Sequence, residues 1–120
     1  MLGPAYAIAE VLDRTKLTID DIDVFEIHEA FAGQVLCTLK AWEDVSYCRK
    51  ELGLTKALGS IDRNKMNVKG GSLALGHPFG ATGARVVGTM AKLLQEKGSG
   101  RGLVSVCTGG GMGVAAILNR

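Results

Sequence analysis

Three short segments hold the residues whose types and spacing could do chemistry. They are residues 28–31 (His-Glu-Ala-Phe), the glycine-rich run 70–83 around His77, and residues 107–113 (Cys-Thr-Gly-Gly-Gly-Met-Gly). Both histidines of the sequence lie in these segments. Imidazole, thiol and glycine amide groups together indicate the acid-base and anion-stabilising parts of one site. None of the three cysteines stands where a covalent nucleophile would be expected beside this set.

His77 lies in Gly-His-Pro-Phe-Gly (76–80), a turn held by proline and placed just ahead of an expected helix. The amino end of a helix carries partial positive charge, and flanking glycines let a substrate approach the backbone. An imidazole there suits general-base catalysis on a thiol or hydroxyl, or hydrogen-bond donation to a carbonyl oxygen that becomes negative. The alternative is a turn histidine that satisfies backbone groups, which the glycines disfavour.

Cys107 ends an expected strand and opens a turn rich in glycine. The amide N–H groups that follow it, with that of Gly109 among them, can form an oxyanion hole. Taken alone, a strand-terminal cysteine is usually a small core residue. Its place at this turn favours a reactive thiol.

His28 lies at the carboxyl end of an expected strand, where the chain enters a helix. His-Glu-Ala-Phe is weak evidence by itself, because it lacks the second histidine of a metalloprotease helix and a capping or buried histidine is the default. The motif becomes informative together with His77 and Cys107, because all three residues lie at strand ends or helix starts, where α/β sheets bind ligands.

Composition and spacing argue against several other classes. A net charge of +2 with 5% aromatic residues does not favour a nucleic-acid surface. Three cysteines without paired spacing argue against a disulfide framework or a structural zinc site, so we expect no metal. Residues 111–116 formally match a dinucleotide-binding fingerprint, but no helix can follow in the four residues that remain. The basic residues of 44–69 are expected to form a solvated surface.

The sequence predicts an α/β fold in one domain with about three strands. Helical spacing indicates helices over 4–15, around 31–42 and over 80–97, and residues 44–69 are expected to hold one short helix. Strands are expected at 24–27, 103–107 and 114–118, the last two antiparallel across the glycine turn. The expected buried helix faces are Phe31, Val35, Leu39 and Trp42, and Val87, Met90, Ala91 and Leu94. Because the chain opens directly on a helix and three strands make a poor sheet, we expect a fragment of a larger domain.

With these segments described, the chain resembles the C-terminal part of a thiolase, the acyl-CoA acyltransferase family. The likeness covers nearly the whole chain, from Gly-Pro-Ala at residue 3 to the last strand. Two motifs carry it, Gly-His-Pro-x-Gly-Ala-x-Gly at 76–83 and Cys-x-Gly-Gly-Gly-Met-Gly at 107–113, in this order and at the family spacing. The family motif at 28–31 commonly begins with Asn. His28 in its place resembles the thiolase subunit of the mitochondrial trifunctional β-oxidation complex.

The resemblance implies a role for each site residue. His77 would activate the nucleophilic cysteine and help bind the thioester oxygen, while Cys107 would shuttle protons to the attacking or leaving group. The Gly109 N–H would join the second oxyanion hole. His28 would replace an Asn that fixes a water in the first oxyanion hole, and Phe31 would line the pantetheine channel. The nucleophile itself comes from the N-terminal half in this family, which these residues do not include.

The resemblance also implies a larger assembly. Two similar halves pack into a five-layer αβαβα arrangement in the family, so residues 1–120 would be a C-terminal domain that lacks its first strands and the whole N-terminal half. Coenzyme A and acyl-CoA would be substrates, with no permanently bound cofactor. Expected partners are the missing half, a homo-oligomer (dimer or tetramer) of the full-length enzyme, and a hydratase/dehydrogenase subunit. The expected location is the mitochondrial matrix in a eukaryote, with the peroxisome or bacterial cytoplasm as alternatives.

The leading functional hypothesis is a 3-ketoacyl-CoA thiolase, which cleaves 3-ketoacyl-CoA with CoA in fatty-acid β-oxidation. The isolated chain would be inactive, since it has no nucleophilic cysteine. One alternative is a biosynthetic acetoacetyl-CoA thiolase, which His28 in place of Asn weakly disfavours. The other is a non-catalytic, thiolase-like assembly module that uses its uncovered layer and the basic segment.

Overall fold

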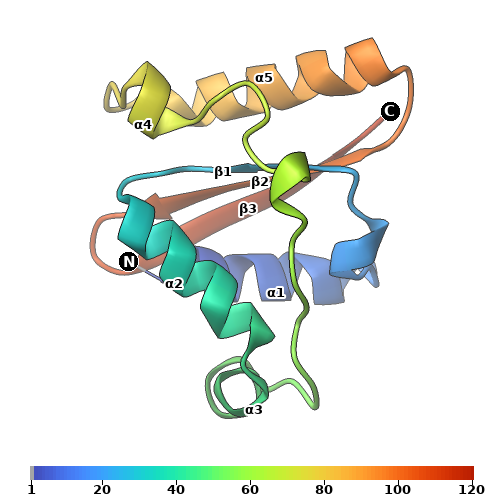
Figure 1. Ribbon diagram of the computed structural model, residues 1–120, viewed down its shortest axis with the longest axis vertical. Coiled ribbons are helices and arrows are strands. Elements are labelled where there is room, and N and C mark those ends of the chain that lie inside the picture. Colours follow the sequence, from blue (N-terminus) through green and yellow to red (C-terminus); the bar gives the residue numbers. More distant parts are fainter. Residues whose placement is uncertain (1) are drawn as a thin grey trace.

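A three-stranded sheet between two layers of helices forms the frame of the molecule, and the computed structural model describes residues 2–120 of it (Figure 1). In chain order the elements are α1 (Gly3–Thr15), β1 (Val24–Ile27), α2 (Ala32–Glu43), α3 (Val45–Leu52), α4 (Ser72–Leu75), α5 (Thr82–Lys97), β2 (Arg101–Thr108) and β3 (Met112–Asn119), with 3-10 turns at Ile19–Asp21 and Arg63–Lys65. This arrangement confirms the predicted α/β class and all three predicted strands. No helix within residues 2–120 combines the length and the apolar character needed to cross a membrane.

The strand order is β1-β2-β3, with β2 in the centre. β1 runs parallel to β2, and β2 pairs antiparallel with β3 over its full length, from Arg101 opposite Asn119 to Thr108 opposite Met112. The link between these two strands contains Gly110 and Gly111 with φ of +85° and +83°, a conformation that other residues rarely adopt. The predicted antiparallel hairpin is therefore confirmed.

Alternate residues of the strands face different helical layers. On one face, Phe25, Ile27 and Leu103 pack with α1 and α2 in the larger core. Trp42 lies fully buried there, and its Nε1 donates to the Ala5 carbonyl oxygen at 3.2 Å. On the other face α5 packs on Val104 through a smaller core, which contains Val86, Met90 and Leu94. In Figure 1, α1 and α2 lie below the sheet and α5 lies above it.

The predictions of the buried helix faces were wrong in two places. Phe31 precedes α2 with extended backbone (φ −148°) and its side chain is 62% exposed, so it does not join the buried stripe of that helix. In α5 the expected residues Met90 and Leu94 are buried, whereas Val87 is 42% exposed and Ala91 is also exposed. Val86, which was not on the expected face, is buried. The sheet decides which of two adjacent apolar residues turns inward, and periodicity alone did not distinguish them.

The segment 44–69 contains the predicted short helix, α3. Asp44 caps it by accepting hydrogen bonds from the backbone N–H groups of Ser46 and Tyr47. At the end of this segment Asn67 lies along the free edge of β1: its N–H donates to the Phe25 carbonyl oxygen at 2.8 Å. The long excursion thus returns to the sheet beside β1 and leads the glycine-rich run toward the strand ends.

The first residue of α1 lies against the beginning of β3. A Cβ added to Gly3 would overlap the backbone of Met112 and Gly113, and a Cβ added to Gly113 would overlap the backbone of Gly3. Only glycine leaves room for two backbones at this distance. The contact fixes the amino end of α1 beneath the hairpin.

Candidate active site

The structure brings His77, Cys107 and Gly109 together at one pocket of about 420 Å³. The pocket lies between the start of α5 and the hairpin, and its remaining lining residues are Phe79, Gly80, Thr82, Gly83, Val106 and Thr108. Two pockets of about 430 and 470 Å³ lie beside α1, and neither is lined by a histidine or a cysteine. Size therefore does not single out the site, whereas the chemistry of the lining does.

His77 stands at the mouth of this pocket on an exposed turn. Its Nδ1 lies 2.6 Å from the Oγ1 of Thr82, a buried residue at the first position of α5. The ring of Phe79, which is 90% exposed, lies 4.9 Å from the His77 ring between centroids. The hydroxyl thus orients the imidazole, and Nε2 binds no other residue in the described part of the chain.

The rings of His28 and His77 are adjacent, with 4.2 Å between their centroids. The backbone N–H of His28 donates to the Ser105 carbonyl oxygen at 2.8 Å, which continues the parallel ladder one residue beyond β1. The strand therefore ends where the sequence predicted, and the side chain points toward α5. Unlike His77, His28 is only 2% exposed, and it is absent from the pocket lining.

The imidazole of His28 belongs to a chain of polar contacts. Its Nδ1 lies 2.8 Å from Ser72 Oγ, and an Arg85 guanidinium nitrogen donates to the same oxygen at 2.7 Å. Burial lowers the pKa of His28 from its usual 6.5, electrostatic interactions with His77 and Arg85 lower it further, and Glu29 opposes this effect. His28 is held in its neutral form.

Glu26 precedes His28 by two residues on β1 and faces the same helical layer. It is 1% exposed, and its Oε1 has no hydrogen-bond partner in the described residues. Burial raises the pKa of Glu26 to about 7; the charge of Arg85 acts in the opposite direction, and that of Glu29 adds to the rise. The layer above the sheet thus contains an acid that titrates near neutral pH.

Cys107 turns its sulfur toward α2. Sγ lies 3.8 Å from Oε1 of Gln34, a long contact in which the thiol is the donor. Gln34 is buried, and its Nε2 has no partner among residues 2–120. The hairpin and α2 therefore meet at a polar contact next to the pocket.

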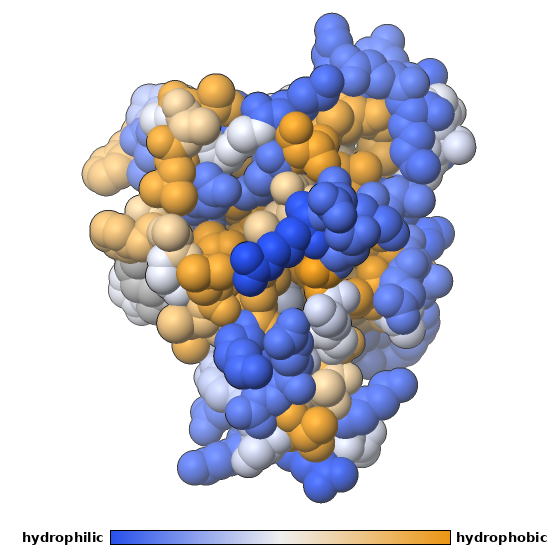
Figure 2. Space-filling model, in the orientation of Figure 1, coloured by the Kyte–Doolittle hydropathy of each residue, from blue (hydrophilic) through white to orange (hydrophobic). Residues whose placement is uncertain are grey.

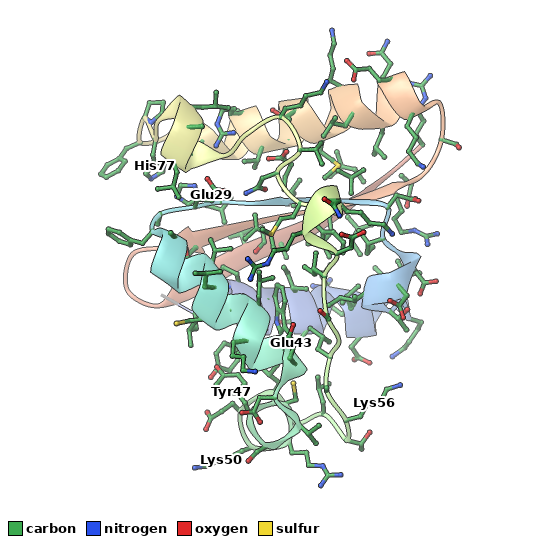
Figure 3. The ribbon with its side chains drawn as sticks, in the orientation of Figure 1. Glu29, Glu43, Tyr47, Lys50, Lys56 and His77 are labelled. Carbon is green, nitrogen blue, oxygen red and sulfur yellow. The ribbon has the colours of Figure 1, made fainter. Side chains whose placement is uncertain are left out.

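Glu29 has a structural task that explains the second residue of the His-Glu pair. Its carboxylate accepts hydrogen bonds from Asn67 Nδ2 at 2.8 Å and from the Leu73 N–H at 3.1 Å. Gly71 lies against this carboxylate so closely that a Cβ there would overlap it. Figure 3 shows Glu29 and His77 at the same end of the molecule. Glu29 thus holds the glycine-rich run in place beside the strand end.

The residues that support the two histidines carry little signal in the sequence. Ser72 and α4 lie in a glycine-rich run for which no helix was predicted. Thr82 and Arg85 lie in a predicted helix, and nothing in their spacing distinguishes them from its other polar residues. The one available signal was Glu26, a carboxylate two positions before His28 in an apolar strand. No three His, Cys, Asp or Glu side chains within residues 2–120 converge as metal ligands would. Phe31 is exposed and does not line the pocket.

The family profile described as "Thiolase, C-terminal domain" matches residues 1–120. This chain belongs to the thiolase family. A 3-ketoacyl-CoA thiolase of Yersinia enterocolitica is 45% identical to the domain over 118 residues, which are 98% of this chain and 27% of the relative. The thiolase domain thus spans a little over a quarter of the length of that curated relative.

Solved structures of thiolases have the same fold. The peroxisomal 3-ketoacyl-CoA thiolase of Saccharomyces cerevisiae is 49% identical with a TM-score of 0.72, covering 99% of the thiolase domain and 29% of the yeast chain. An acetyl-CoA acetyltransferase of Syntrophomonas wolfei is 36% identical with a TM-score of 0.78, covering 98% and 27% of the two chains. The predicted resemblance and fold class are confirmed.

Proposed function

We propose that this domain supplies one wall of the active site of a 3-ketoacyl-CoA thiolase, an enzyme that cleaves 3-ketoacyl-CoA with CoA in the degradation of fatty acids. The observation that carries the proposal is the pocket at which His77, Cys107 and Gly109 meet. Their groups are an imidazole, a thiol and a backbone N–H, and the three come from two segments that are far apart in sequence. The likeness to proteins named 3-ketoacyl-CoA thiolase supports the choice of substrate.

The chemistry of the cleavage assigns the tasks. A thiolate adds to the 3-keto carbon, the C2–C3 bond breaks, and the carbanion of the leaving acetyl-CoA takes up a proton. The thiol of CoA must then lose its proton before it attacks the acyl-enzyme. Two proton-transfer groups are therefore needed, and His77 and Cys107 are the two that line the pocket. The N–H of Gly109 would bind the oxygen that becomes negative in each addition.

In this proposal none of the three cysteines is the nucleophile. Cys37 is exposed on α2, and Cys48 is the buried residue of α3, whose thiol donates to the Ala41 carbonyl oxygen at 3.4 Å. Cys107 fills the proton-transfer role in the proposal. A second polypeptide segment would supply the nucleophile, so the isolated chain would not turn over substrate.

The apolar surface near the pocket is the place where that segment would dock. Phe79, Phe31 and Leu73 are 90%, 62% and 62% exposed, and Met112 beyond the glycine turn is 60% exposed. Figure 2 shows apolar surface gathered over α4 and the beginning of α2. Exposed apolar patches of this kind mark surfaces that other protein segments cover. We propose that the rest of a thiolase, and CoA with its acyl group, occupy this end of the molecule.

A hybrid enzyme tests the proposal. These 120 residues replace the matching C-terminal part of the Yersinia thiolase, and acetoacetyl-CoA cleavage by CoA is followed. We expect the hybrid to be active and the isolated chain to be inactive. His77→Ala and Cys107→Ser should each lower kcat by about 10²- to 10⁴-fold. Tyr47→Phe, at the far end of the molecule (Figure 3), serves as the matched control. A folded hybrid without activity, or an active isolated chain, would contradict the proposal.

The second candidate is the biosynthetic condensation of two acetyl-CoA molecules. It is favoured by the likeness to two solved acetyl-CoA acetyltransferases, the Syntrophomonas enzyme and that of Bacillus anthracis, which is 39% identical with a TM-score of 0.75 and matches over 98% of this chain and 26% of its own. Longer 3-ketoacyl-CoA substrates separate the two candidates in the hybrid. Cleavage of acetoacetyl-CoA alone would favour the biosynthetic enzyme.

A further inference from the structure

Ser72 lies at the centre of a buried hydrogen-bond chain that connects α5 with the end of β1. Arg85 donates to Ser72 Oγ at 2.7 Å, and Ser72 Oγ lies 2.8 Å from His28 Nδ1. Ser72 and His28 are 6% and 2% exposed. Within residues 2–120, no further hydrogen bond reaches Ser72 Oγ or the His28 ring.

The direction of these bonds follows from the chemistry of the groups. A guanidinium only donates, so the Ser72 oxygen accepts from Arg85. The hydroxyl hydrogen then has one acceptor within reach, the Nδ1 of His28. If Nδ1 carried a proton instead, Ser72 would accept twice and its own hydrogen would stay unpaired in a buried place. The favoured arrangement leaves a lone pair on Nδ1 and the ring proton on Nε2.

The surroundings of the ring keep it neutral. Burial disfavours the imidazolium and lowers the pKa of His28, interactions with His77 and Arg85 lower it further, and Glu29 acts in the opposite direction. Glu26 faces the same layer from β1 and is itself largely protonated below neutral pH, because burial raises its pKa to about 7. At neutral pH the His28 ring therefore carries a single nitrogen-bound proton.

We propose that Ser72 and Arg85 are positioning residues, which hold His28 as the neutral Nε2–H tautomer and so make it a hydrogen-bond donor in the site. Nε2 is the ring nitrogen that no other residue of the described chain binds, so its proton is left for water or a ligand. That a substrate group or its water receives this bond rests on the proposed function. The tautomer itself rests on the hydrogen-bond chain alone.

His77 provides the contrast within the same site. Its Nδ1 also faces a hydroxyl, that of Thr82, at 2.6 Å. No other side chain in residues 2–120 donates to the Thr82 hydroxyl, so this hydroxyl can either donate to Nδ1 or accept from it. His77 thus keeps both tautomers available, as a group that takes up and releases protons needs, whereas His28 is fixed.

Nuclear magnetic resonance of ¹⁵N-labelled histidine tests the proposal on the 120-residue chain. The sequence contains only two histidines, and His77→Asn assigns their signals. We expect the ring pattern of His28 to be that of a neutral imidazole with a protonated Nε2 and a bare Nδ1. Ser72→Ala and Arg85→Met should each move the two nitrogen signals of His28 toward one another, as a tautomer mixture does. Ser72→Thr keeps the hydroxyl and should restore the single pattern.

Thr82→Val is the matched control, because it removes the other hydroxyl and should alter His77 while leaving His28 unchanged. A protonated Nδ1 on His28, the averaged signals of a free imidazole, or an unchanged pattern in both the Ser72→Ala and Arg85→Met variants would overturn the proposal. The wild-type spectrum decides the tautomer even where a variant unfolds. An inactive hybrid enzyme with a fixed His28 would refute the proposed function and leave this inference intact.

Discussion

The two faces of the sheet are built from the same strands but differ in character, because one carries the larger apolar core and the other combines a smaller apolar core with buried polar groups. Phe25 and Ile27 of β1 enter the larger core, which α1 and α2 close. Glu26, which lies between them, and His28, which follows, enter the layer of α4 and α5, where Ser72 and Arg85 meet them. The period of two in a strand lets one segment anchor the fold on one side and support chemistry on the other. The larger core beneath the sheet fixes the strands, and the strands in turn position the polar groups of the α4 and α5 layer.

Removal of a large side chain from the apolar face should have the largest effect on stability. Phe25 is 1% exposed, and Phe25→Ala should lower the free energy of unfolding by about 3–5 kcal/mol. Urea unfolding followed by the fluorescence of Trp42, which lies in the same core, measures the change. Val104→Ala on the α5 face removes fewer atoms and should cost about 1.5 kcal/mol. A smaller loss for Phe25→Ala than for Val104→Ala would show that the larger core is not closely packed around Phe25.

The polar face should make stability depend on pH through Glu26. Burial raises its pKa from 4.5 to about 7, so the folded state holds this proton more tightly than the unfolded state. Its contribution is fully present below pH 4.5 and is lost as the pH rises through about 7, by up to about 3 kcal/mol. Glu26→Gln should remove this loss.

The comparison of wild type with Glu26→Gln isolates this one group. His28 contributes with the opposite sign, since its pKa is lowered and its contribution grows as the pH rises toward 6.5, but it is present in both proteins. The difference in the free energy of unfolding between the two proteins is measured from pH 4.5 to 8. A difference that does not change with pH would show that Glu26 titrates normally.

Loss of the Glu29 contacts, which hold the glycine-rich run beside the end of β1, should have an intermediate effect on stability. Glu29→Ala removes the acceptor of the Asn67 amide and of the Leu73 N–H, and it should cost about 1–3 kcal/mol. The loss should be concentrated in residues 67–76, so amide hydrogen exchange there should rise more than in α1. Glu29→Gln keeps one acceptor oxygen and should fall between the alanine variant and wild type.

The smallest effect on stability is expected for an exposed ion pair at the end of α1. Lys16 and Asp13 pair at 3.1 Å with side chains that are 79% and 75% exposed. Lys16→Gln should change the free energy of unfolding by less than about 0.5 kcal/mol, because exposed ion pairs contribute little. The same urea titration measures it, and a larger loss would mean that this surface contributes to the core beneath it.

The sequence predicted the parts of the fold that follow from local rules. Short runs rich in apolar residues identified the strands, and the glycines between Thr108 and Met112 indicated the hairpin. The buried side of α5 was predicted correctly for Met90 and Leu94 but not for Val87, because Val86 and Val87 are equally apolar and only the sheet decides between them. Phe31 was included in the apolar stripe of the second helix, but it lies one residue before α2 with extended backbone, which turns it away from that stripe.

In the site, too, the residues within motifs were predictable from the sequence, whereas the contacts between distant residues were not. The motifs placed His77 and Cys107 at turns, and the structure brings both to one pocket. The supporting contacts were not predictable, because Ser72 lies 44 residues from His28 and the Cys107 thiol meets Gln34 across 73 residues. The first pair depends on where the excursion of residues 44–69 returns to the sheet, and the second on how α2 packs against the end of β2; periodicity encodes neither. The roles of His28, His77, Cys107, Gly109 and Phe31 in catalysis stay predictions.

The close approach of Gly3 to Gly113 means that the start of α1 packs directly against the hairpin. Residues more than a hundred positions apart share a space that has no room for a methyl group. Removal of α1 would therefore leave the turn after Cys107 without the backbone against which it packs. The conformation of this turn depends on the start of α1 as well as on its own glycines.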